Sequence, residues 1–144
     1  TCMNFMDKHK TIICYYSKLT RSICEKFGLT QMEYDILMFL HNHPQFNTAA
    51  DIVKIRKATK SHVSTTLKTL EDNGLVRKIQ SPDNKKRIEI ELLEPAQKVI
   101  QEGLSVQKEF VKDLFQGLSE EELRMWQSIF TKVCNNAERC LKEK

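Results

Sequence analysis

Glycine and proline are scarce in this sequence of 144 residues, which contains only four of the first and three of the second. Disordered and collagen-like chains are rich in these residues, so both classes are excluded. The longest uninterrupted apolar run, from Ile36 to Leu40, is far shorter than the ~20 residues that a membrane-spanning helix needs. With 40% hydrophobic and 29% charged residues, the composition predicts a soluble cytoplasmic protein the size of one ordinary domain.

Cysteine and histidine are present without the spacing of a metal or redox site. The five cysteines lie at positions 2, 14, 24, 134 and 140, and no two of them form a C-x-x-C motif. Reduced thiols of a cytoplasmic protein are the simplest explanation. The sequence also lacks a glycine-rich phosphate loop, a nucleophile elbow and a His-Glu-x-x-His motif. It therefore predicts no enzyme, no cofactor and no resident metal.

Positive charge is concentrated in about a quarter of the chain. The segment from Lys54 to Arg87 contains ten lysines and arginines against three acids, a balance of +7, whereas the whole chain carries only +4. The remaining residues must therefore be acidic overall. A basic cluster of this size is the electrostatic footprint of a protein that binds a polyanion such as nucleic acid.

Helix-capping signals divide the chain into segments. Three hydroxyl residues are each followed by an acid three positions later: Thr30 by Glu33, Thr48 by Asp51 and Ser119 by Glu122. Glycines at positions 28 and 74 are suited to end helices. Together with apolar repeats of three and four residues, these signals predict helices over about 4–26, 30–43, 48–55, 59–72, 95–115 and 119–141.

Between residues 75 and 92 the apolar period changes from 3.6 to 2. This predicts strands over 75–79 and 87–92, joined by a turn rich in Ser, Pro, Asp and Asn. Two short helices followed by a two-stranded ribbon form a winged helix-turn-helix, and the basic segment covers the parts that face DNA. The predicted fold is mainly α with a small β-hairpin wing. Residues 29–94 form the winged helix-turn-helix, flanked by long helices of a dimerisation region over 1–28 and 95–144.

The second helix of a helix-turn-helix enters the major groove of DNA. If Val63, Leu67 and Leu70 face inward, the remaining face of the 59–72 helix is free to read bases, and small hydroxyl residues suit that role. Arg87 is the candidate for minor-groove insertion by the wing, with Lys86 as the alternative. The predicted DNA-binding residues are Lys57, Thr59, Lys60, Ser61, His62, Ser64, Thr65, Lys68, Asp83, Lys85, Lys86 and Arg87.

Three stretches of the sequence carry a likeness to a known family: "LTQMEYDIL" from Leu29, "TAADIVKIRKATKSHVSTTLKTLEDNGLVRK" from Thr48 and "SPDNKKRIEIELLEPAQ" from Ser81. The sequence resembles the MarR family of bacterial transcriptional regulators. That family's wing commonly carries Asp-x-Arg and then Leu-Thr, a pattern from which this wing departs, so its register is open by one residue. The resemblance implies that Asp83 orients Arg87 or Lys86 through an ion pair; an ordinary turn aspartate is the alternative.

The outer helices carry more apolar surface than one small core would use. The expected use is a homodimer interface, which members of the family also build from their terminal helices. Two-fold symmetry would place two reading helices about one DNA turn apart, on an inverted-repeat operator. The predicted interface residues are Phe5, Ile12, Tyr16, Leu19, Trp126, Phe130, Val133 and Leu141.

The function predicted is a homodimeric, sequence-specific regulator of transcription, a repressor that binds double-stranded DNA. The family resemblance implies release by a small phenolic or lipophilic effector. A non-sequence-specific architectural DNA-binding protein is the alternative from charge alone. A cysteine sensor would use Cys14, beside Tyr15 and Tyr16, although a buried, inert Cys14 is favoured. A metal sensor would need His41 and His43 with Glu25 or Cys24, and has the least support.

Overall fold

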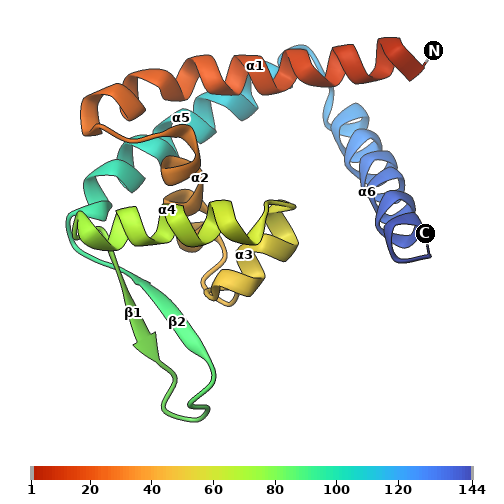
Figure 1. The fold of residues 1–144 in the computed structure, drawn as a ribbon. Coiled ribbons are helices and arrows are strands. Elements are labelled where there is room, and N and C mark those ends of the chain that lie inside the picture. The colour runs from red at the N-terminus through yellow and green to blue at the C-terminus, as the bar shows by residue number, and fades with distance from the viewer. Residues whose placement is uncertain (1, 144) are drawn as a thin grey trace. The chain divides into compact units, whose positions relative to one another are not determined.

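The computed structural model describes residues 2–143, with side chains from Asn4 onward. The described elements are α1 (Cys2–Phe27), α2 (Gln31–Asn42), α3 (Ala49–Arg56), α4 (Lys60–Asp72), β1 (Val76–Gln80), β2 (Ile88–Leu92), α5 (Ala96–Leu114) and α6 (Glu120–Glu143) (Figure 1). This confirms the predicted fold class, a mainly helical chain with a small hairpin wing. The chain divides into two compact units, with the boundary between Lys108 and Glu109.

Local capping chemistry determines where several helices begin. All three predicted capping boxes form, with hydroxyl and acid each accepting a backbone N–H: Thr30 with Glu33, Thr48 with Asp51 and Ser119 with Glu122. Gly28 follows α1 and Gly74 follows α4, with φ angles of 64° and 74° that a side chain would strain. The element boundaries therefore follow from interactions spanning only a few residues.

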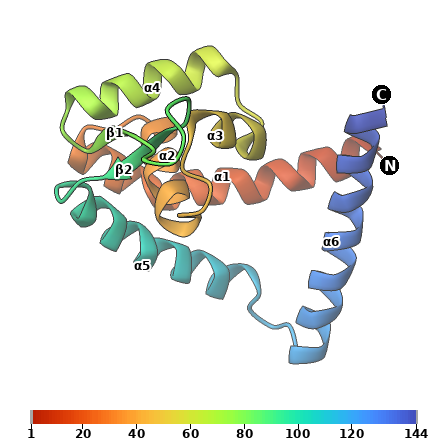
Figure 2. The same cartoon turned by 90° about the horizontal axis from the view of Figure 1, so that it is seen from below.

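The core of the first unit is built around α2. Tyr34, Ile36 and Leu37 of this helix are completely buried. Side chains of α1, α3, α4, both strands and α5 complete the core, and α2 lies between α4 and α5 in Figures 1 and 2. At Gly103 of α5 an added Cβ would lie 2.7 Å from the Tyr34 hydroxyl, so this contact between helices depends on glycine.

The turn between α3 and α4 contains a strained residue. Lys57 has a φ of 55°, and it is the only non-glycine residue with a positive φ within the described part of the chain. An L-residue in this conformation costs about 1–2 kcal/mol, against about 0.5–1 kcal/mol of chain entropy for glycine. We expect Lys57→Gly to raise the free energy of unfolding by roughly 0.5–1 kcal/mol in a denaturant titration. Lys57→Ala, which keeps the strain, should give no increase; an equal gain from both would refute this explanation.

The second unit consists mainly of α6, and none of the residues of this helix is buried. Trp126 stacks on Phe130 with ring centroids 5.0 Å apart, and Phe115 packs against the Trp126 ring at 4.7 Å. Trp126 and Phe130 therefore contact each other on one side of α6, but they are not buried in a core. Within residues 2–143, no helix has both the length and the apolar character that crossing a membrane requires.

The apolar residues of α1 divide into two groups. Phe5 and Ile12 are exposed by 62% and 41%, whereas Tyr16 packs against the core of the first unit. Cys14 is exposed, so the expectation of a buried thiol is wrong for this chain. The reason is that residues 4–14 of α1 are all exposed, so this part of the helix has no core beside it.

Candidate nucleic-acid interface

Helix α4 has one buried and one exposed face. Val63, Leu67 and Leu70 are at most 2% exposed, which confirms the predicted inward face. The six residues predicted to face outward from this helix are all exposed: Lys60, Ser61, His62, Ser64, Thr65 and Lys68. The helix therefore presents a continuous polar surface over its first two turns.

The hydroxyl groups of this region are not equally available. Thr59 accepts a hydrogen bond from the His62 backbone N–H at 3.1 Å, so its side chain caps α4. Thr66 donates to the His62 carbonyl at 2.7 Å. The hydroxyls of Ser61, Ser64 and Thr65 form no such bond to any residue between 2 and 143, and they can accept or donate to a ligand without breaking the helix.

The wing is a two-stranded antiparallel hairpin in which Val76 pairs with Leu92 and Gln80 with Ile88. Its turn is closed by the Ser81 N–H donating to the Arg87 carbonyl at 2.9 Å. Inside it, the Asn84 side chain accepts from the Lys86 backbone N–H at 3.0 Å. These bonds leave the side chains of Lys85 and Lys86 exposed in the turn, at the end of the hairpin (Figure 1).

Arg87 lies on the strand side of that turn and is half-buried. Its guanidinium donates to the Glu89 carboxylate at 3.3 Å and to the Asn47 side-chain oxygen at 3.2 Å. Asp83 is exposed and makes no ion pair within the described residues. The expected pairing of Asp83 with Arg87 or Lys86 is therefore corrected: the carboxylate partner of Arg87 is Glu89 on β2, and its second partner is Asn47 in the α2–α3 loop.

Ion pairs neutralise much of the basic segment. Five of its cations face an acid: Arg56 pairs with Asp35, Lys68 with Asp72, Arg77 with Glu91, Lys78 with Glu71 and Arg87 with Glu89. Lys54 of α3, Lys60 at the start of α4 and the two wing-tip lysines have no such partner within residues 2–143. The positive charge without an acidic partner therefore lies on α3, at the first turn of α4 and at the tip of the wing.

The residues considered for sensing lie in separate environments. Cys24 is half-buried, and burial raises the pKa of its thiol, helped by the carboxylates of Asp35 and Glu33. That thiol is consequently a poor nucleophile at neutral pH. The His43 ring lies between the rings of Phe39 and Phe46, at 4.9 and 6.4 Å. Among the described residues, no three His, Cys, Asp or Glu side chains are grouped to hold a metal.

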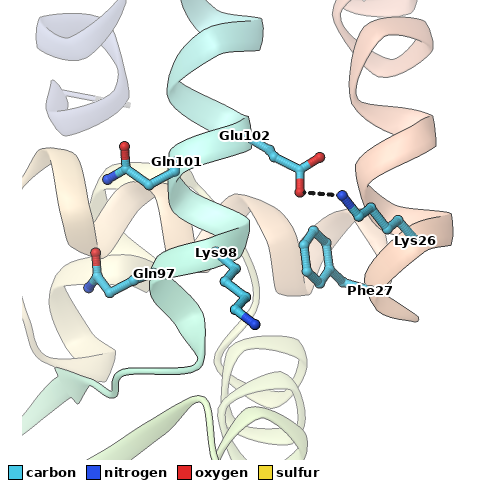
Figure 3. Close-up of a pocket in the computed structure, with 6 residues that line it drawn as sticks. All are labelled: Lys26, Phe27, Gln97, Lys98, Gln101 and Glu102. Carbon is cyan, nitrogen blue, oxygen red and sulfur yellow. Dashed lines mark hydrogen bonds and ion pairs between the residues drawn. The ribbon is translucent and has the colours of Figure 1, made fainter.

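An open groove of about 600 Å³ lies between the end of α1 and the first half of α5. Lys26 and Phe27 face it from α1, and Lys98 and Glu102 extend toward them from α5 (Figure 3). The Lys26 ammonium donates to the Glu102 carboxylate at 2.8 Å across it. This space has an aromatic wall and a charged rim, features that suit a small amphipathic molecule.

Known proteins share both the sequence and the fold of this chain. A sequence profile of the MarR family matches residues 27–87. YsmB, an uncharacterized HTH-type transcriptional regulator of Bacillus subtilis, is 21% identical over 119 residues, which cover 83% of this chain and 81% of YsmB. The structure of S. aureus MepR in its DNA-binding conformation superposes with a TM-score of 0.82 and 25% identity, over 92% of this chain and 98% of MepR. The S. aureus MepR–DNA complex gives a TM-score of 0.75 and 26% identity, with 94% of each chain covered.

The fold, the exposed polar face of α4 and the basic wing tip define a DNA-binding transcriptional regulator of the winged helix-turn-helix class. The chain is similar to the MarR family, whose profile matches the segment from the end of α1 through the wing turn. The prediction from the sequence did not include Asn47 and Glu89 as partners of Arg87. No local signal reveals the first of these, because the two residues are 40 positions apart.

Proposed function

We propose that this protein is a homodimeric repressor that binds an inverted-repeat operator through α4 and the wing and is released by a small effector. The observation that carries the DNA-binding part is that three unpaired cations lie at the start of α4 and at the wing tip. These are the two places where a winged helix-turn-helix meets the phosphate backbone. Cations that keep an acidic partner, such as Arg77 with Glu91, would contribute less to the binding of a polyanion.

On α4 the proposed roles follow from side-chain chemistry. Ser61, His62, Ser64 and Thr65 include the residues that contact base edges, since each is exposed and carries a short hydrogen-bonding group. Lys57, Lys60 and Lys68 contact phosphates, and Thr59 supports the helix start through its cap. In the wing, Lys85 and Lys86 are the proposed DNA contacts. Lys86 takes the place first expected for Arg87, because the Arg87 side chain is held by Asn47 and Glu89.

The Lys68→Ala variant tests the phosphate assignment. Lys68 is 3.7 Å from Asp72 in an exposed pair that contributes little, so phosphate can displace the acid. We expect weaker binding to all DNA sequences alike, with the slope of log affinity against log salt falling by about one unit per subunit. Fluorescence anisotropy over a range of salt concentrations measures this. A loss confined to one base pair of the site would instead make Lys68 a base reader.

Sequence specificity separates this proposal from an architectural role. Operator candidates selected from random DNA should show a common inverted repeat, and binding to it should exceed binding to random DNA by roughly 10³-fold or more at one fixed salt concentration. Equal affinity for both would identify an architectural protein.

The proposed dimer joins two chains through the regions 1–28 and 95–144, where exposed apolar side chains are available on α1 and α6.

The proposed effector is a small phenolic or lipophilic molecule. The family resemblance supplies the class of molecule. The open groove between α1 and α5, with its aromatic wall and charged rim, is the proposed binding place. The position is informative because only three residues, 93–95, separate the end of β2 from α5, the helix that forms one side of this space. Loss of operator binding on adding such compounds, measured by anisotropy, tests this part.

A further inference from the structure

Asn47, in the loop between α2 and α3, makes two hydrogen bonds to the wing. Its backbone carbonyl accepts from the Ile90 N–H at 2.7 Å, and its side-chain oxygen accepts from the Arg87 guanidinium at 3.2 Å. The first bond holds strand β2, and the second holds the residue at the end of the turn. One residue of the helical part thus contacts the wing at two points along its length.

The wing needs such an attachment because its outer half has almost no core. Val76 and Ile90 are buried, whereas Ile88, further toward the tip, is 50% exposed. A two-stranded hairpin is marginally stable without packing on other elements. Hydrogen bonds to the helical part therefore largely determine the direction in which the wing tip points.

The attachment continues from Asn47 to the tip lysines through Arg87. The Arg87 guanidinium also donates to Glu89, and its backbone N–H and carbonyl bond to Asn84 and Ser81 across the turn. Lys86 is the next residue along the chain. On the other side, Thr48 directly follows Asn47 and caps α3, the first helix of the helix-turn-helix.

We infer that Asn47 is a positioning residue for DNA binding: acting through Arg87, it fixes the wing relative to the helix-turn-helix so that Lys85 and Lys86 reach the DNA. The inference rests on the proposed function, since it assigns Asn47 no contact with DNA. It also makes Arg87 a positioning residue rather than a side chain inserted into the minor groove.

The test compares Asn47→Ala with Asn47→Asp, which keeps an acceptor for the guanidinium. We expect Asn47→Ala to weaken operator binding on the order of tenfold, because a hydrogen bond to a charged group is lost. Asn47→Asp should retain most of the operator affinity. In hydroxyl-radical footprints the Ala variant should lose protection of the DNA backbone where the wings lie, while protection of the backbone beside the α4 sites remains. Asn42→Ala is the matched control, because the Asn42 side chain bonds to Gln107 and not to the wing.

A double-mutant cycle distinguishes the positioning role from a general loss of stability. In a Lys85→Ala, Lys86→Ala background, at low salt where binding is still measurable, Asn47→Ala should cause no further loss. An undiminished tenfold loss in that background, or wild-type binding by Asn47→Ala alone, would overturn the inference. Failure of the proposed function would look different: the two lysine substitutions alone would then leave binding unchanged.

Discussion

The Phe130→Glu variant is expected to sediment as a monomer where the unaltered protein sediments as a dimer. Trp126, Phe130 and Val133 lie on one stripe of α6 and are 40 to 47% exposed in the single chain. An amphipathic helix with no buried residue needs a partner surface for its apolar side. Two-fold symmetry makes every substitution count twice, so losing about 1.5–3 kcal/mol of apolar burial per copy raises the dissociation constant of the dimer by roughly 10²- to 10⁴-fold.

The control for this experiment is Asn135→Glu, which adds the same charge on the opposite side of α6. The control should remain a dimer in sedimentation velocity at the same protein concentration. Dissociation by both variants would indicate a general charge effect on α6, and a stable Phe130→Glu dimer would remove α6 from the interface. Because an operator of two half-sites needs two reading helices, the monomeric variant should also lose most of its operator affinity.

The parts of the fold predicted from the sequence are those determined over short distances. The capping boxes join residues three positions apart, so Thr30 and Glu33 identify the start of α2 without knowledge of the rest of the chain. The two faces of α4 follow from helical periodicity, and Val63 and Leu67 are buried as that periodicity requires. Apolar spacing and capping chemistry therefore sufficed for the element order and for the outward face of α4.

The details that the sequence did not predict depend on contacts between distant segments. Arg87 was expected to act at the wing tip with Asp83, four residues away, but its partners include Asn47, which is 40 positions distant. Cys14 was expected to be buried and inert, yet the first half of α1 has no core beside it. In both cases local pattern identifies the right residue types, and only tertiary packing decides which way they point.

Replacing Lys85 and Lys86 together with alanine should cause the largest loss of operator binding at the DNA interface. Both side chains are exposed in the wing turn without an acidic partner among the described residues. Contacts of this kind contribute on the order of 1–3 kcal/mol, or about ten- to hundredfold in affinity, and both subunits lose them at once. The slope of log affinity against log salt should fall by roughly three to four units, since four charges leave the dimer–DNA interface. The free energy of unfolding should change by less than ~0.5 kcal/mol, as is usual for exposed positions.

Two controls identify the cause of that loss. Lys108→Ala with Lys112→Ala removes the same charge from exposed positions on α5 and should change operator affinity little. Asp83→Ala removes a negative charge from the same turn; since Asp83 has no ion pair within residues 2–143, its removal should tighten binding by reducing repulsion from phosphates. Anisotropy titrations of all three proteins at physiological salt measure these effects. Equal losses in the α5 and wing variants would attribute the effect to net charge alone, whereas undiminished binding by the wing variant would mean that the wing tip does not touch DNA.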